Sequence, residues 1–214
     1  VAQTWSTPTP EAATTVSAAD LDWRQVLVDP RLQGVVDLAL KQNRDLRVAV
    51  NISGHQLRQS DFVHSVRAAL AESGLPPDQL TLEITESVLI EQAHATVDLL
   101  RQLADEGLHL SIDDFGTGYS SLSYLKRFPV DALKIDRSFI AEIDRNPDDD
   151  AIVTGIIALA HSLRLKVVAE GVETEAQRVI VRDRGCDIIQ GYFYSKPLAP
   201  FIFEQYMLAP ERMV

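Results

Sequence analysis

Acidic and amide side chains recur along the chain, each at the end of a short aliphatic stretch. The acids are Glu83, Asp113, Asp114 and Glu170, and an amide, Asn51, holds the same position after an earlier stretch. Carboxylates gathered at one place raise one another's pKa, so a cation is needed to keep them ionised. Oxygen ligands without His or Cys select hard ions such as Mg²⁺ or Mn²⁺ rather than zinc. These five residues are therefore predicted metal ligands.

The adjacent acids Asp113 and Asp114 suggest two ions, because one carboxylate can bridge both metals while its neighbour binds one of them. Two metals about 3.5–4 Å apart are the usual device for in-line displacement at phosphorus. Lys134 is expected beside them, where it would orient a nucleophilic water or neutralise charge on a phosphate. The alternative for Lys134 is a lysine paired with carboxylates for structural reasons alone.

Strands that alternate with helices would position these residues. Helical spacing predicts helices over 61–73, 89–106 and 174–184, an earlier one between 32 and 40, and one with an acidic first turn at 148–150. Residues 6–20, rich in Pro, Thr, Ser and Ala, are expected to form a loop. Aliphatic alternation predicts six strands, at 46–53, 79–85, 108–115, 132–136, 166–172 and 188–195.

This alternation predicts an α/β fold with parallel crossovers, either an open doubly wound sheet or a closed (β/α)8 TIM-type barrel. In each strand the aliphatic parity would face the helices, and the other parity carries one polar residue near the carboxyl end. Six such residues converging from six strand ends are typical of the catalytic face of a barrel, whereas an open sheet gathers them at one switch point. We therefore expect the barrel.

Composition and charge exclude several classes of protein. With 214 residues, 46% of them hydrophobic and 24% charged, the chain is an ordinary globular protein of one large domain. Its net charge of −11 disfavours non-specific binding to nucleic acid or to anionic membranes. The single cysteine, Cys186, excludes an internal disulfide framework and fits a reducing, cytoplasmic location. No apolar run is long enough to span a bilayer.

Six motifs together resemble the EAL domains, bacterial phosphodiesterases that open cyclic di-GMP to the linear dinucleotide pGpG. They cover most of the chain from Leu46 to Leu198 in the family's order. The motifs are VNIS (50–53), LEITES (82–87), DDFGTGYSSLSYL (113–125), LKIDRSF (133–139), VVAEGVET (167–174) and QGYFYSKPL (190–198).

The resemblance implies a role for each matching residue. It implies that Lys134 positions or deprotonates the attacking water, that Gln190 supports the site, and that Glu86 anchors the mobile DDFGTGYSS loop. Glu173 and Asp136 are expected to have structural roles next to the site. The residues implied as metal ligands are Asn51, Glu83, Asp113, Asp114 and Glu170, the last completing the metal and water shell.

The N-terminus departs from the family pattern. The family's EAL-x-R-W segment supplies a glutamate ligand and a phosphate-binding arginine. In the register set by Trp5, Thr4 stands where the arginine belongs and the glutamate would precede Val1. We expect residues 1–20 to be the remnant of a first strand with its loop, and 21–214 to be a single barrel domain incomplete at that strand. Either truncation of the sequence or genuine degeneration of the domain would explain why the first strand and its glutamate are missing.

Three functions follow from these features. The first is metal-dependent hydrolysis of cyclic di-GMP to pGpG. The second is a catalytically impaired domain that binds cyclic di-GMP or another protein, as Thr4 and the missing front edge suggest. A different Mg²⁺ barrel, abstracting a proton with Lys134, comes third. From the family we also expect a homodimer and an upstream sensory or GGDEF-type domain in a longer protein.

Overall fold

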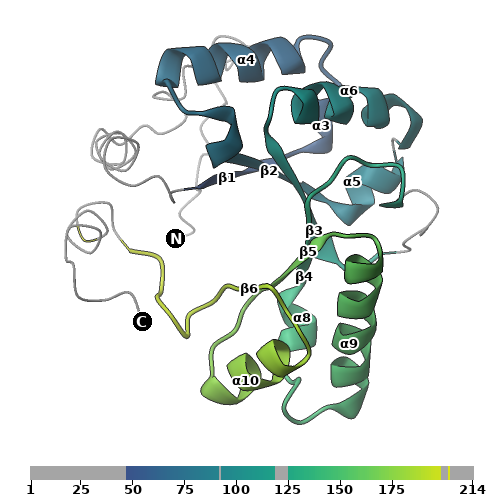
Figure 1. Ribbon diagram of the computed structural model, residues 1–214, viewed down its shortest axis with the longest axis vertical. Helices are drawn as coiled ribbons and strands as arrows, with labels where there is room; N and C mark the ends of the chain where they lie inside the picture. The colour runs from purple at the N-terminus through teal and green to yellow at the C-terminus, as the bar shows by residue number, and fades with distance from the viewer. Residues whose placement is uncertain (1–46, 92, 119–124, 199–201, 203–214) are drawn as a thin grey trace, which may run out of the picture.

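The computed structural model describes residues 47–91, 93–118, 125–198 and 202. They form one six-stranded sheet in which every neighbouring pair is parallel and the strand order follows the chain (Figure 1). The strands are β1 (Val48–Ile52), β2 (Leu80–Thr85), β3 (His109–Phe115), β4 (Ala132–Ile135), β5 (Lys166–Ala169) and β6 (Ile188–Ile189). A doubly wound sheet would reverse this order at a switch point. The unbroken order is that of a TIM-type (β/α) barrel, as predicted.

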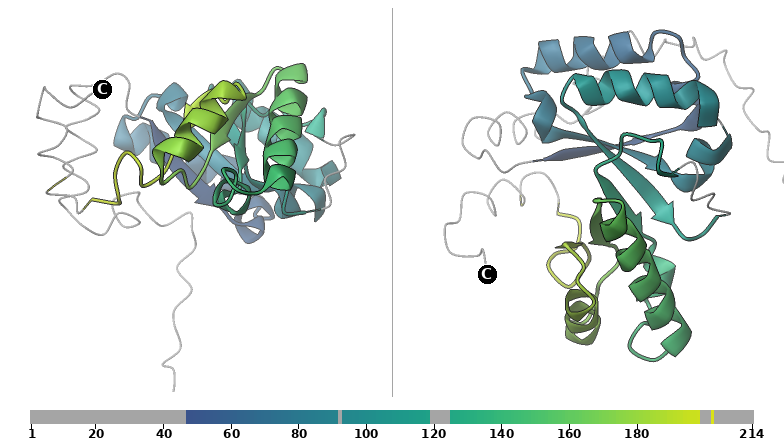
Figure 2. Two further views of the ribbon diagram at one scale, coloured as in Figure 1. Left: turned by 90° about the horizontal axis from the view of Figure 1, so that it is seen from below. Right: turned by 45° about the vertical axis from the view of Figure 1, so that its right-hand side comes forward.

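Helices follow the strands along one face of the sheet. Figure 1 shows α4 and α6 beside β1 and β2, whereas α8, α9 and α10 gather around β4 to β6, and the second view of Figure 2 agrees. The helices are α3 (Gly54–Leu57), α4 (Phe62–Ser73), the 3-10 turn η2 (Pro77–Gln79), α5 (Glu86–Glu91), α6 (Ala93–Asp105), α8 (Arg137–Ile140), α9 (Pro147–Ser162) and α10 (Glu175–Asp183). In the described residues, no helix combines the length and apolarity needed to cross a membrane.

The core forms where the aliphatic parity of the strands meets the helices. The predicted parity is buried in the central strands, with exposed fractions of 8% or less at Leu80, Leu82, Ile84, Leu108, Leu110, Ile112, Leu133 and Ile135. On β1, Ile52 is buried, but Val48 is only half-buried and Val50 is 39% exposed, because β1 is the edge strand of the described sheet. Burial of the remaining aliphatic rows fixes the register, since a slip by one residue would turn each row to the opposite face.

Two strands are much shorter than predicted because glycines turn the chain, whereas the other four differ from the prediction by only one or two residues at an end. The 166–172 strand ends at Ala169, and Gly171 then adopts a φ of +70°. A Cβ at Gly171 would lie 2.6 Å from Arg137 Cβ, so only glycine fits. The 188–195 strand is reduced to Ile188–Ile189, because Gly191 packs directly against the backbone of Val172 and starts a turn.

Most of the predicted helices fall within the described residues and are present there. The helices expected at 61–73 and 174–184 are confirmed as α4 and α10. The helix with an acidic first turn is α9, whose cap is Asn146, with its side chain accepting from Asp148 N. The helix expected over 89–106 corresponds to the end of α5 and to α6, which lie on either side of residue 92, outside the described part of the chain. The helix between 32 and 40, the 20/21 domain boundary and the register around Trp5 lie outside the described residues.

Candidate metal centre and active site

The predicted site residues lie at the carboxyl ends of the strands. Asn51 on β1 is paired with Glu83 on β2, and Glu83 in turn is level with Ser111 on β3. Asp113 lies two residues beyond Ser111, on the same face of that strand. The parallel register therefore brings an amide and two carboxylates from three adjacent strands to one edge of the sheet.

Lys134 is the centre of the cluster. Its Nζ lies 2.9 Å from Glu83 Oε1, 3.1 Å from Asp113 Oδ1 and 2.6 Å from Glu170 Oε1. The Lys134 side chain is 6% exposed, and the three carboxylate side chains are between 12% and 20% exposed. Three predicted ligands from three different strand ends thus meet on one buried ammonium group.

Burial and hydrogen bonding have opposite effects on Lys134. Burial disfavours the charged ammonium, but hydrogen bonds to Glu170 and Glu83 outweigh it and hold the pKa of Lys134 above its usual value. Burial also raises the pKa of Glu170, with Asp113 and Glu83 adding to the effect and Lys134 opposing it. Lys134 therefore carries its proton in this arrangement and acts as a donor.

Asp114 reaches the same cluster through an irregularity in β3. Regular alternation would send Asp113 and Asp114 to opposite faces of the strand. The register between β3 and β4 shifts between Ile112 and Phe115, and Asp114 has a φ of +53°, outside the usual strand region. As a result, Asp113, Asp114 and Glu170 each offer a carboxylate oxygen within 4.8 Å of the others. Burial, then Asp113, then Asp136 raise the pKa of Asp114.

The chemistry of this donor set fits a hard divalent cation. Four carboxylates, from Glu83, Asp113, Asp114 and Glu170, face the single ammonium of Lys134, which leaves an excess of negative charge. All of these donors are oxygens, the ligands that Mg²⁺ and Mn²⁺ prefer. A bound cation would offset the repulsion that raises the pKa of Asp114.

Glu86 is hydrogen-bonded to the start of the 113–121 loop. It is the first residue of α5, is 4% exposed, and its Oε2 accepts a hydrogen bond of 2.9 Å from Gly116 N. A Cβ at Gly118 would lie 3.1 Å from Glu86 Oε1, so the loop backbone passes close to the carboxylate. The contact expected for loop anchoring is therefore present at Gly116; residues 119–124 lie outside the described part.

Gln190 is tied to the segment after β5 through its backbone. Its N donates to Ala169 O at 2.9 Å, and its carbonyl accepts from Val172 N at 3.1 Å. Its side chain is exposed and makes no hydrogen bond to the carboxylates within the described ranges. Asp136, expected next to the site, caps α8 by accepting from Ser138 N at 2.9 Å and also contacts Asp114.

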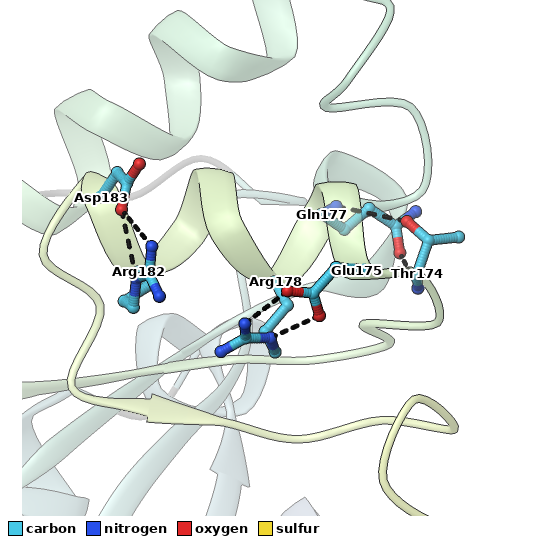
Figure 3. A network of polar contacts seen from close by, with 6 residues as sticks. All are labelled: Thr174, Glu175, Gln177, Arg178, Arg182 and Asp183. Atoms are coloured by element: carbon cyan, nitrogen blue, oxygen red, sulfur yellow. Dashed lines mark hydrogen bonds and ion pairs between the residues drawn. The ribbon is translucent and has the colours of Figure 1, made fainter.

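Gln177 is absent from the residues predicted from the sequence, yet its side chain binds the backbone of Glu173 and Thr174, a few residues after Glu170. Figure 3 shows its side chain joined to Thr174 at the start of α10, where the two form a capping box, with the Glu175–Arg178 pair on the next part of the helix. The spacing Thr-x-x-Gln at 174–177 is the signal that could have identified it.

Comparison with known proteins agrees with this geometry. The family model for the EAL domain matches residues 12–197. Cyclic di-GMP phosphodiesterase NbdA of Pseudomonas aeruginosa is 48% identical over 172 residues, which cover 80% of this chain and 22% of NbdA. The chain spans about a quarter of the length of the curated relatives it matches.

Solved structures of similar fold include nucleotide complexes. The PaMucR phosphodiesterase in complex with c-di-GMP is 45% identical, with a TM-score of 0.77, over 85% of this chain and 73% of that chain. A manganese and cyclic di-GMP complex of Klebsiella pneumoniae BlrP1 is 33% identical, with a TM-score of 0.70, over 79% of this chain and 42% of that chain. With the family model matching most of its residues, the chain belongs to the EAL-domain family.

Proposed function

We propose that this chain hydrolyses cyclic di-GMP to linear pGpG with two divalent cations, Mg²⁺ or Mn²⁺. The observation that carries the proposal is the convergence of Glu83, Asp113 and Glu170 on Lys134, with Asp114 turned into the same cluster. The name of NbdA, the c-di-GMP in the PaMucR complex and the manganese in the BlrP1 complex support the substrate and the need for a metal.

The carboxylates would hold the ions. Glu83, Asp113, Asp114 and Glu170 supply the charged oxygens, and Asn51, level with Glu83 in the sheet, supplies an amide oxygen. When bound, such ions lower the pKa of water and neutralise charge that develops on a phosphate. Burial of the cluster strengthens each of these electrostatic interactions, because water that would screen them is excluded.

Lys134 would position the nucleophile. Without metal, its raised pKa leaves the ammonium protonated, and in that form it would donate hydrogen bonds to the attacking water or to a phosphate oxygen. Deprotonation of the water is the second role that the family resemblance implies. Glu86 would hold the 113–121 loop over the substrate through Gly116, and Gln190 would support the Glu170 segment through Val172.

The chain would act as one module of a longer signalling protein. Its relative MucR of Pseudomonas aeruginosa carries the name bifunctional diguanylate cyclase/cyclic di-GMP phosphodiesterase, and the match covers 25% of it. We extend the proposal to an upstream sensory or GGDEF-type domain, to a homodimer, and to the cytoplasm as the location of the reaction.

The test is incubation of the purified chain with cyclic di-GMP and either Mg²⁺ or Mn²⁺, with products resolved by anion-exchange chromatography against pGpG and GMP standards. We expect pGpG, abolished by EDTA and by Asp113→Asn, which keeps the size of the side chain and removes its charge. Circular dichroism of that variant should match the wild type. Undiminished turnover by Asp113→Asn would contradict the two-metal assignment. Nucleotide binding without product would favour a receptor instead.

A further inference from the structure

We infer that Gln177 is a positioning residue for Glu170, because it fixes the backbone segment that joins Glu170 to α10. The kinetic part of this inference rests on the proposed function, whereas its structural part concerns only this chain. Gln177 touches none of the acids itself, so it would act entirely through the segment 171–174.

The side chain of Gln177 is buried, and both its oxygen and its nitrogen are hydrogen-bonded. It is 5% exposed, and its Oε1 accepts from Glu173 N at 2.8 Å and from Thr174 N at 3.0 Å. Its Nε2 donates to Ala141 O, next to the end of α8, at 3.1 Å. Since two amides require an acceptor and a carbonyl requires a donor, these partners fix the orientation of the amide group. Gln177 thus bridges the Glu170 segment and the end of α8.

The first half of the segment is held by the sheet. Glu170 N donates to Ile135 O at 3.2 Å, and Val172 N donates to Gln190 O at 3.1 Å. Beyond Val172, the next two backbone amides donate to Gln177. The chain between Glu170 and α10 is therefore fixed at one end by Ile135 of β4 and by Gln190 after β6, and at the other by the Gln177 side chain together with the first turn of α10.

Loss of the Gln177 side chain would displace Glu170. Removing the Gln177 amide would take away the partner that the amides of Glu173 and Thr174 share with the carbonyl of Ala141. These three residues are exposed, so water would replace the lost hydrogen bonds, and the segment would no longer be tied to the end of α8. The Glu170 carboxylate lies only 2.6 Å from Lys134 Nζ. A displacement of about 1 Å at such a group can cost on the order of 100-fold in rate.

The decisive variant is Gln177→Met, which keeps the length and burial of the side chain and removes its acceptor and donor. For cyclic di-GMP with Mn²⁺ we expect kcat to fall about 10- to 100-fold, the usual range for residues that orient metal ligands, with KM nearly unchanged. The affinity for Mn²⁺, measured by calorimetry without nucleotide, should weaken. Gln177→Glu keeps an acceptor oxygen for both amides and should recover most of kcat.

Thr174→Ala is the matched control. It removes the other half of the capping box, the bond from Gln177 N to Thr174 Oγ1 at 3.2 Å, but leaves the three side-chain bonds of Gln177. We expect it to lower the Tm, as loss of an N-cap does, while kcat and Mn²⁺ affinity remain close to wild type. Equal losses of kcat in Thr174→Ala and Gln177→Met would overturn the inference, because both would then reflect helix capping alone.

Hydrogen exchange tests the role of Gln177 independently of the proposed function. The amides at positions 173 and 174 should exchange faster in Gln177→Met and remain protected in Thr174→Ala. If the wild type yields no pGpG, the proposed function fails, and Mn²⁺ affinity together with exchange still decides the role of Gln177. Unchanged hydrogen exchange and unchanged Mn²⁺ affinity in Gln177→Met would overturn the inferred role of Gln177. Should that variant not fold, Gln177→Asn, too short to reach its partners, is expected to show the same losses.

Discussion

Lys134 Nζ lies 2.6 Å from Glu170 Oε1, the shortest of its three contacts with carboxylates. Lys134 lies on β4 and Glu170 directly follows β5, and these two strands are adjacent in the sheet. Their contact means that the acid expected to complete the metal shell is also the main partner of the group expected to orient water. Stability and catalysis are therefore linked at this pair.

Lys134→Met should destabilise the metal-free protein and abolish turnover. The substitution leaves Glu83, Asp113 and Glu170 without their shared cation, and breaking a buried ion pair on one side costs about 3–5 kcal/mol. Added Mn²⁺ should restore much of this loss, because a cation can take over the neutralising role. Urea denaturation with and without Mn²⁺ measures both effects.

The control for this prediction is Lys166→Met, at the exposed start of β5 and the opposite end of the strand. It should change the free energy of unfolding by less than about 0.5 kcal/mol, in either direction. A metal-free Lys134→Met variant as stable as Lys166→Met would contradict the view that the ammonium holds the carboxylates together.

Asp114→Asn should stabilise the metal-free protein at neutral pH while abolishing metal-dependent turnover. Burial and the charges of Asp113 and Asp136 raise the pKa of Asp114, so the folded state favours the protonated form. The contribution of Asp114 to stability is then full below about pH 4, its unfolded pKa, and is lost as the pH rises through the folded pKa. Asparagine also tolerates the positive φ at this position.

Thermal unfolding without metal, followed from pH 3 to pH 7, checks this effect. The Tm of Asp114→Asn should exceed that of the wild type at pH 7, and the difference should vanish near pH 3. Asp148→Asn, in the first turn of α9, is the control with the opposite sign, since it removes a charge that favours the helix dipole. A lower Tm for Asp114→Asn at pH 7 would argue against repulsion within the cluster.

Much of the fold and of the site follows from residue alternation. The parity of β2, β3 and β4 correctly places Glu83, Asp113 and Lys134 on one face, because side chains alternate and the aliphatic rows must be buried. Asp114 does not follow from alternation, since it depends on a shift in register between β3 and β4. The Thr-x-x-Gln spacing could identify Gln177 as a helix cap, but not its contact with Ala141, which is 36 residues away in the chain.

Glu86→Ala should lower kcat through the 113–121 loop. The variant removes the acceptor of the 2.9 Å bond from Gly116 N and leaves a space against Gly118. Since the same strand and loop carry Asp113 and Asp114, we expect a loss on the order of 100-fold. Glu86→Gln keeps an acceptor oxygen of the same size and should lose much less. Steady-state kinetics compares the two, and equal losses would point to the charge of Glu86 rather than to loop anchoring.

Asp187→Asn should lower the stability of the folded protein. It should not affect turnover, because Asp187 precedes β6 and so lies at the end of the strands opposite the acids. Its Oδ2 accepts from Val167 N at 2.8 Å and faces His161 Nε2 at 2.9 Å. Burial raises the pKa of Asp187, but these hydrogen bonds outweigh burial and hold it below the usual value. The stabilisation is therefore present above about pH 4 and lost as the pH falls through the folded pKa.

The Tm difference between wild type and Asp187→Asn should accordingly be largest near pH 7 and disappear near pH 3. Both side chains of the pair are more than one third exposed, so solvent screening limits the effect to less than about 1 kcal/mol. The rate of pGpG formation at neutral pH should equal that of the wild type. A large loss of rate would show that the two ends of the strands are coupled, contrary to the usual separation of catalytic and stabilising faces in such barrels.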